Sequence, residues 1–318
     1  MKKLFAFFLL AVFIISGVSC SPHANPASDF TYEITENTVV ITQYIGSDTS
    51  VVIPDEIEGL PVCTIGENAF TQSNVEEVTI PASIQEYSYA FSECNTLKKV
   101  HLQKGLQLID GGAFKKCIAL EEIEIPESIE KIGTEAFALS GLKKVKLPKN
   151  LQTLEGYAFY RCPALEEVHL TDDIQNWLFD RQFAENPALT TVILDEGVTQ
   201  IGPYSFISCT ALESVTFPKS LTDLGVSAFS GCSSMKSVTF LGDKPEDLEG
   251  YTLNAERKKP IIVYYDPAAK GWEDAEIENL VFRPIGTGND EPAPVPTAKI
   301  EGDFEYEMIK DMAVITKY

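Results

Sequence analysis

Apolar residues recur along this chain with a period of about 23 residues. Each period contains one phenylalanine, which follows Ala in six of the eight cases: Phe70, Phe91, Phe114, Phe137, Phe159, Phe183, Phe206 and Phe229. A segment with the spacing apolar-x-x-apolar-x-apolar comes next, such as LEEVHL at 165–170, and an apolar-x-x-apolar segment such as IEKI at 129–132 completes the period. Eight copies cover residues 61–241, and a fixed period of this length is typical of a repeat solenoid.

The alternation in the LEEVHL-type segment predicts a short β-strand. Val168 and Leu170 would point into the core, while Glu167 and His169 would point to solvent. We expect the Ala-Phe segment to form a short helical turn across from this strand. The predicted fold class is therefore an α+β repeat solenoid of about eight units, which must stack because no unit can bury its own apolar side.

The repeated residues also resemble those of a known family. L-x-x-V-x-L-P followed by I-x-x-I-G-x-x-A-F-x-x-C resembles the BspA-like leucine-rich repeats of bacterial surface proteins, over about 180 of the 318 residues. The resemblance implies a leucine-rich repeat stack. It also implies adhesion or ligand binding at a surface, with varied partners and without shared catalytic residues.

The segments on both sides of the repeats lack the phenylalanine period. FTYEIT and TVVITQYI predict a β-hairpin, so that residues 30–60 would form an N-terminal β cap over the first repeat. Residues 242–283 keep strand-like segments and are interpreted as a degenerate closing repeat. Residues 284–298 are rich in Pro, Gly and acidic residues, as in a linker.

The last segment, 299–318, echoes the cap. DFEYEMIKDMAVITKY at 303–318 matches DFTYEITENTVVITQY at 29–44 with an offset of 274 residues. It is interpreted as the truncated start of a second cap module, left by a shortened gene or kept as a vestigial tail. We expect it to be poorly packed or to pair with another surface.

The N-terminus has the pattern of a bacterial export signal. Lys2 and Lys3 precede an apolar run from Leu4 to Ile15, which is short for a membrane-spanning helix. The following SGVSC resembles a lipoprotein signal, so residues 1–19 are expected to be removed and Cys20 to carry a lipid. Residues 20–29 would then be a tether, and the protein would lie at the bacterial cell surface or outer envelope. Cleavage and secretion without a lipid is the alternative.

The net charge excludes some partners. It is −22 for the whole chain and becomes −24 once the two lysines of the signal are removed. A chain this acidic is not expected to bind nucleic acid or anionic lipid, because both reward clustered Lys and Arg. Contact with a membrane is expected only through the lipid on Cys20, and the protein is expected to be a monomer.

Cysteines occupy one position of the repeat, three residues after the phenylalanine: Cys94, Cys117, Cys162, Cys209 and Cys232. Ser or Asn takes this position in other copies, which predicts a small side chain in a tight place, hydrogen-bonded to backbone. Disulfides between neighbouring copies are the alternative. No CxxC pair indicates zinc, and His101 and His169 are three repeats apart, so neither a metal nor a cofactor is expected.

The predicted outward positions change character along the repeats. From Glu76-Glu77 to Glu166-Glu167, pairs of like charge alternate in sign from copy to copy. They are interpreted as a ladder that keeps strands in register, with a charged docking stripe as the alternative. The following copies carry neutral residues, which are favoured for ligand contact. The candidate residues of this part are His169, Thr191, Ile193, Thr216 and Thr239.

The sixth copy, with IQNWLFDRQF at 174–183, is one residue longer than its neighbours. An inserted residue can form a bulge, and exposed aromatic and Arg side chains are favoured in recognition. Trp177, Phe179 and Arg181 are therefore candidate ligand contacts. The alternative is that Trp177 fills a local gap in the core.

These observations predict a non-enzymatic adhesion module that binds an extracellular protein or glycan. No catalytic motif is present in the sequence, so no catalytic residue is expected. A structural spacer of the cell envelope is the first alternative. A glycan-processing enzyme is the second, and it would require two carboxylates about 5–10 Å apart in a cleft.

Overall fold

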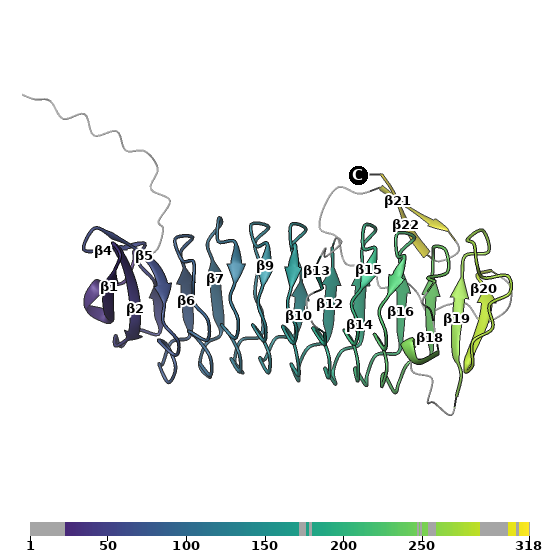
Figure 1. Ribbon diagram of the computed structural model, residues 1–318, viewed down its shortest axis with the longest axis horizontal. Helices are drawn as coiled ribbons and strands as arrows, with labels where there is room; N and C mark the ends of the chain where they lie inside the picture. The colour runs from purple at the N-terminus through teal and green to yellow at the C-terminus, as the bar shows by residue number, and fades with distance from the viewer. Residues whose placement is uncertain are drawn as a thin grey trace, which may run out of the picture.

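The repeats coil into one elongated solenoid (Figure 1). The computed structural model describes residues 23–171, 176–177, 180–246, 248, 250–253, 259–286, 305–309 and 312–317. The predicted signal peptide 1–19, the lipidation residue Cys20 and nearly all of the predicted linker 284–298 lie outside these ranges. No helix in the described ranges is long and apolar enough to cross a membrane.

The LEEVHL-type segments form a row of parallel strands along one side of the solenoid. These strands are β6 (Glu77–Ile80), β7 (Lys99–Leu102), β10 (Lys144–Lys146), β12 (Glu167–Leu170), β14 (Thr191–Leu194), β16 (Ser214–Phe217) and β18 (Ser237–Phe240). β3 (Ser50–Val52) extends the row at one end, and β19 (Ile261–Tyr265) and β20 (Leu280–Pro284) extend it at the other. Val145, Val168 and Val192 pair in register and are buried, which confirms the predicted alternation.

A second parallel row is formed by very short strands from the apolar-x-x-apolar segments. Its members are β8 (Leu108–Ile109), β9 (Lys131–Ile132), β11 (Thr153–Leu154), β13 (Asn176–Trp177), β15 (Gln200–Ile201) and β17 (Asp223–Leu224). Their second residue continues the core, since Ile109, Ile132 and Leu154 are buried.

The Ala-Phe segments form turns, so the α+β assignment is wrong. The only helices among the described residues are the 3-10 helices η1 (Ala27–Asp29) and η2 (Gly250–Leu253). Tyr157 and Arg161, two residues before and after Phe159, both have positive φ, and the other seven copies repeat this pattern. Left-handed residues interrupt an α-helix. The backbone hydrogen bonds run between copies instead, as Phe159 N–H donates to the carbonyl of Gln182.

The eight repeat phenylalanines form one continuous stack in the core. Consecutive ring centroids lie 4.5–5.5 Å apart, with the planes within 28° of each other. All eight side chains are buried. Each copy therefore shares its largest apolar side chain with both neighbours, as the period predicts.

The cysteine position is tight and hydrogen-bonded to backbone. Cys94, Cys117, Cys162, Cys209 and Cys232 are buried free thiols, and each Sγ donates to the carbonyl of the phenylalanine one copy earlier, at 2.9–3.3 Å. The amide of Asn186 fills the same role toward Phe159 at 3.0 Å. In these six copies the side chain satisfies a buried carbonyl, whereas Ser140 Oγ contacts Cys162 Sγ at 3.5 Å instead.

An antiparallel hairpin covers the first repeat. It consists of β1 (Phe30–Thr35) and β2 (Thr38–Tyr44), and β2 pairs in parallel with β5 (Leu60–Ile65). β5 also pairs with β4 (Glu56–Ile57). The ring of Tyr44 lies 5.4 Å from that of Phe70, so the hairpin extends the aromatic stack.

A second hairpin near the end of the chain has the same backbone pairing. β21 (Glu305–Ile309) and β22 (Met312–Lys317) are antiparallel. Tyr306 pairs with Ile315 as Tyr32 pairs with Ile41, and both hairpins have a register shift directly before that tyrosine. The similarity of the two sequences therefore extends to the register and the bulge.

Candidate functional site

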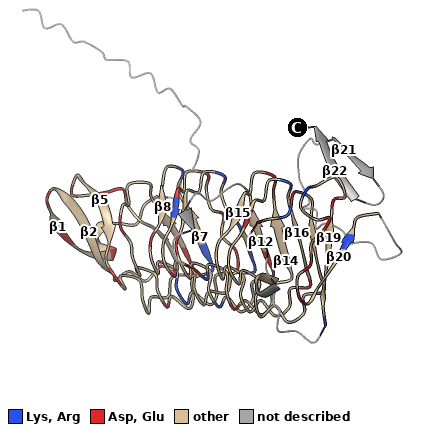
Figure 2. Cartoon of the chain, turned by 45° about the vertical axis from the view of Figure 1, so that its right-hand side comes forward, with Lys and Arg blue, Asp and Glu red and all other residues tan. Residues whose placement is uncertain are grey.

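The strand face is the surface formed by the outward side chains of the β6–β20 row. Charged residues of both signs lie along the solenoid (Figure 2). On the first part of the face, oppositely charged residues of adjacent copies form ion pairs: Glu76–Lys98 at 2.9 Å, Glu121–Lys143 at 2.5 Å and Lys144–Glu167 at 3.4 Å. Exposed pairs of this kind contribute little stability but favour one register.

The two repeat histidines take part in separate pairs. His101 Nε2 lies 2.6 Å from Glu77 Oε1, and this contact lowers the pKa of the Glu77 carboxyl. His169 Nε2 lies 2.9 Å from Asp195 Oδ1, and only 12% of the His169 side chain is exposed. His169 therefore offers a ligand little more than one edge of its ring.

The predicted neutral contacts come together on the later strands. Thr191 and Ile193 lie on β14, with Ile193 in register with His169, and both are partly exposed. Thr216 on β16 is also partly exposed and is in register with Thr239 on β18. Thr239 is only 5% exposed, so it offers a ligand little surface.

The hydrogen-bonded ladder under the strand face is interrupted twice. It consists of three sheets, with strand orders β3-β6-β7, β10-β12-β14 and β16-β18-β19-β20. The first interruption is the segment 121–126 between β7 and β10, which forms no strand although all its residues are described. The second lies between β14 and β16.

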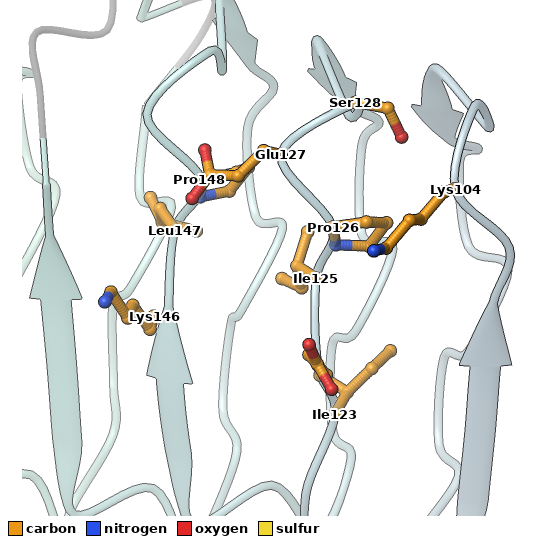
Figure 3. Close-up of a pocket in the computed structure, with 10 residues that line it drawn as sticks. Lys104, Ile123, Ile125, Pro126, Glu127, Ser128, Lys146, Leu147 and Pro148 are labelled. Atoms are coloured by element: carbon orange, nitrogen blue, oxygen red, sulfur yellow. The ribbon is translucent and has the colours of Figure 1, made fainter. Parts of the chain in front are cut away.

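A hollow lies at each interruption. The small hollow, of about 80 Å³, lies between β14 and β16 and is lined by Val192, Ile193, Leu194, Glu196, Thr216, Pro218 and Leu241. It brings two of the predicted contacts, Ile193 and Thr216, to one place. The large hollow, of about 680 Å³, lies beside residues 123–128 and is also lined by Lys104, Lys146, Leu147 and Pro148 (Figure 3). The large hollow is not visible in the sequence, because LEEIEI at 120–125 has the same pattern as paired copies.

Two of the three candidates of the sixth copy, Trp177 and Arg181, lie away from the strand face. The backbone of Trp177 pairs with Leu154 in the second row, at a position where Leu154 and Ile132 are buried. This register agrees with the alternative that Trp177 belongs to the core, but its side chain, like all of Phe179, lies outside the described residues. Arg181 lies on the turn side of the solenoid.

On that side, Arg181 joins an aromatic and charged cluster that the sequence did not predict. Its guanidinium lies 5.0 Å from the centre of the Tyr204 ring and 2.6 Å from Asp180 Oδ2. One copy earlier, Arg161 lies 5.0 Å from the centre of the Tyr160 ring and pairs with Glu185. The available signal was the placement of Arg161, Arg181 and Tyr204 at left-handed positions of successive copies, with Tyr160 next to Arg161.

The described residues provide no place for a metal ion. In residues 23–171 and the other described ranges, no group of three or more His, Cys, Asp or Glu side chains could hold one.

Known proteins share this architecture. The family model for "BspA type Leucine rich repeat region (6 copies)" matches residues 63–182 and 178–257. A leucine-rich repeat protein of T. pallidum, with a solved structure, is 26% identical with a TM-score of 0.52, over 67% of this chain and 91% of that chain. One from Bacteroides ovatus is 23% identical with a TM-score of 0.51, over 74% and 70%. No curated protein matches. The chain belongs to the BspA-type leucine-rich repeat family.

Proposed function

We propose that this protein is a non-enzymatic recognition module that binds an extracellular protein or glycan on the later part of its strand face. Membership of a family of binding repeats supports a protein-binding role. The observation that carries the assignment to this part of the face is the small hollow, where Ile193 and Thr216 meet on adjacent strands.

Hydroxyl and apolar groups form most of the surface around the small hollow, although Glu196 lines it and the Lys236–Glu213 ion pair lies on the later part of the face. A ligand confined to Thr191, Ile193 and Thr216 avoids that pair, whereas on the first part of the face it would desolvate ion pairs. Removing charged groups from water is costly unless they are paired again. The hollow can receive one small apolar group of the partner, and the hydroxyls around it can donate and accept hydrogen bonds.

Display at the cell surface completes the proposal. The sequence pattern at residues 1–20 supports export and a lipid on Cys20, after which the tether would hold the solenoid away from the membrane. Adhesion to host or neighbouring cells follows if the ligand is itself part of a cell surface or matrix.

The experiment is a binding screen of the full-length protein, purified in detergent, against arrays of extracellular-matrix proteins and glycans. The test variant, Ile193→Glu/Thr216→Glu, places two carboxylates at the small hollow. We expect it to lose binding to whichever probe the native protein retains. The control, Thr222→Glu, makes the same exchange at an exposed residue directly before β17, in the second row, and is expected to bind normally.

Two results would contradict the proposal. Equal binding by the test variant and the native protein would remove the site assignment. If the native protein retains no probe from either array, the spacer role in the envelope becomes the better explanation. Trp177→Ala in the same screen tests whether the sixth copy contributes a contact.

A further inference from the structure

On the first part of the strand face, four successive copies each carry two adjacent charges of one sign. In chain order these pairs are Glu76-Glu77, Lys98-Lys99, Glu121-Glu122 and Lys143-Lys144, so the sign alternates from copy to copy. The first residue of each pair is bonded within the chain, through the ion pairs Glu76–Lys98 and Glu121–Lys143. This ladder uses one charge of each copy.

The second residue of each pair is bonded less completely. Glu77 contacts His101, and Lys144 lies 3.4 Å from Glu167. Lys99 and Glu122 are exposed, and neither forms an ion pair with any residue in the described ranges. The ladder therefore leaves two opposite charges unpaired on the two middle copies of the four.

The alternation of sign makes this surface complementary to itself. A twofold axis that runs parallel to the strands, between β7 and the segment 121–126, reverses the order of the copies and keeps the direction of the strands. It places the first of the four copies opposite the fourth and the second opposite the third, with opposite signs in each case. The solenoid runs straight along these copies (Figure 1, Figure 2), so two such faces can meet over this length.

We infer that the first part of the strand face binds a second copy of this chain, face to face about this twofold axis. Lys99 lies opposite Glu122 of the second copy, and Glu77 lies opposite Lys144 of the second copy. Each contact occurs twice because the interface is symmetric. A neutral ligand would remove these charges from water without pairing them, whereas a second copy pairs each charge that it covers.

The neighbouring outward positions agree with this register. His101 lies opposite Glu124 of the second copy, and Lys146 lies opposite Thr79 of the second copy, so no like charges meet in the four copies. An axis one copy further along the chain would instead place His101 opposite His169. It would also place Glu122 opposite Lys144, which already has a partner in its own chain.

The net charge of −22 opposes association, but the charge is unevenly distributed. Residues 23–97 contain twelve acidic residues and no Lys or Arg, whereas residues 98–149 contain ten lysines and seven acidic residues. The axis sets the acidic first copy of each chain against the lysine-bearing fourth copy of the other. At about 0.15 M salt the Debye length is about 8 Å, so repulsion between more distant charges is largely screened.

The contact is centred between β7 and the segment 121–126, away from the small hollow between β14 and β16. The inference therefore does not depend on the proposed function, and either can fail without the other. It replaces the expectation of a monomer, which considered only the net charge.

The test is zero-length cross-linking of the full-length protein in detergent at about 0.15 M salt. A carbodiimide joins a Lys amine directly to a carboxylate, and an equal mixture of heavy-isotope and unlabelled protein separates contacts between chains from contacts within one. We expect cross-linked peptides of mixed isotope that join Lys99 to Glu122 and Lys144 to Glu77. They should disappear at about 1 M salt, where the Debye length falls to about 3 Å.

Charge exchange tests the register. Lys99→Glu places like charges together at two points of the interface and should lower the yield of the mixed Lys144–Glu77 product by about tenfold or more. Lys99→Glu/Glu122→Lys restores opposite charges at both points and should restore that yield. Lys219→Glu is the control, because it makes the same exchange at an exposed residue in the loop after β16 and should leave the yield unchanged.

Four results would overturn the inference. The first is that the Lys99–Glu122 and Lys144–Glu77 products contain one isotope only. The second is that mixed products join Glu122 to Lys144, or are spread over unrelated lysines as in chains that only share a micelle. The third is equal yields from Lys99→Glu and Lys219→Glu, and the fourth is no recovery in the double variant.

Discussion

At the scale of single residues, each copy contributes one large ring and one small donor to the core. Phe159 lies between Phe137 and Phe183, with ring centroids 5.1 Å from both. Cys162, three residues later, donates to the Phe137 carbonyl and joins the same two copies. Each repeat is therefore joined to its neighbours by a ring contact and a hydrogen bond. Substitution of either residue removes a contact between two copies.

Phe159→Ala should lower the free energy of unfolding by about 3–5 kcal/mol, because it leaves a cavity between two fixed rings. Urea denaturation followed by circular dichroism measures the change. Ile118→Ala is the control, since Ile118 is 61% exposed and its truncation should shift the midpoint little. Similar shifts for the two variants would show that the aromatic stack is not the main source of stability.

The repeat thiols should be unreactive in the folded protein. Burial raises the pKa of Cys94 to about 12 and that of Cys162 to about 11, so almost no thiolate forms near neutral pH. Cys63 is partly exposed. Iodoacetamide at pH 8 followed by peptide mapping should therefore label Cys63 and leave Cys94 and Cys162 unmodified until denaturant is added. Prompt labelling of the repeat thiols in native buffer would contradict their burial.

At the scale of elements, close approach of neighbouring turns explains the repeat glycine. A Cβ on Gly225 would lie 2.5 Å from the Pro203 backbone nitrogen and 2.6 Å from the Gly202 carbonyl carbon. These are backbone atoms of the preceding copy, which cannot move without shifting a turn.

Gly225→Ala should therefore destabilise the protein, by about 1–3 kcal/mol as for other overpacked positions. The measurement is the urea midpoint. Gly111→Ala is the control, because Gly111 lies in another turn three residues before Phe114 and its Cβ would meet the nearest neighbour at an ordinary 3.4 Å. A larger loss for Gly111→Ala would mean that spacing between turns does not limit this position.

Sequence reasoning predicted the elements whose pattern is set by burial and missed those set by backbone geometry. The strand alternation and the phenylalanine stack follow from the spacing of apolar residues, which can be read directly from the sequence. The helical turn was wrong because left-handed residues such as Glu135, Leu139 and Arg161 are unusual choices at positive φ, and their identity does not reveal it. The two hollows lie where strand pairing is interrupted, and LEEIEI at 120–125 carries no residue that distinguishes it from a paired strand.

At the scale of the whole molecule, the solenoid is a line of copies that contact mainly their neighbours, with a hairpin covering one end; the bond from Tyr89 Oη to Glu135 Oε2 at 3.3 Å joins copies two apart. Stability in such a stack is approximately a sum of copy and interface contributions. The two interruptions divide the strand row into three sheets, and we expect them to limit how far a local opening spreads. In the second row, β8, β9 and β11 pair past the first interruption and β15 pairs with β17 past the second. Together with the hydrogen bonds between the turns at the repeat phenylalanines, these pairs hold the three sheets in one solenoid.

A defect in the hairpin should therefore loosen the beginning of the stack and leave its end protected. Val39 on β2 is fully buried, so Val39→Asp places a carboxylate in the core under the hairpin. Hydrogen exchange followed by mass spectrometry should show faster exchange in β6 and β7 and almost no change in β16 and β18. Ile34→Asp on β1 is the control, because Ile34 is 49% exposed. Uniformly faster exchange along the chain would show that the whole stack opens as one cooperative unit and that the interruptions do not divide it.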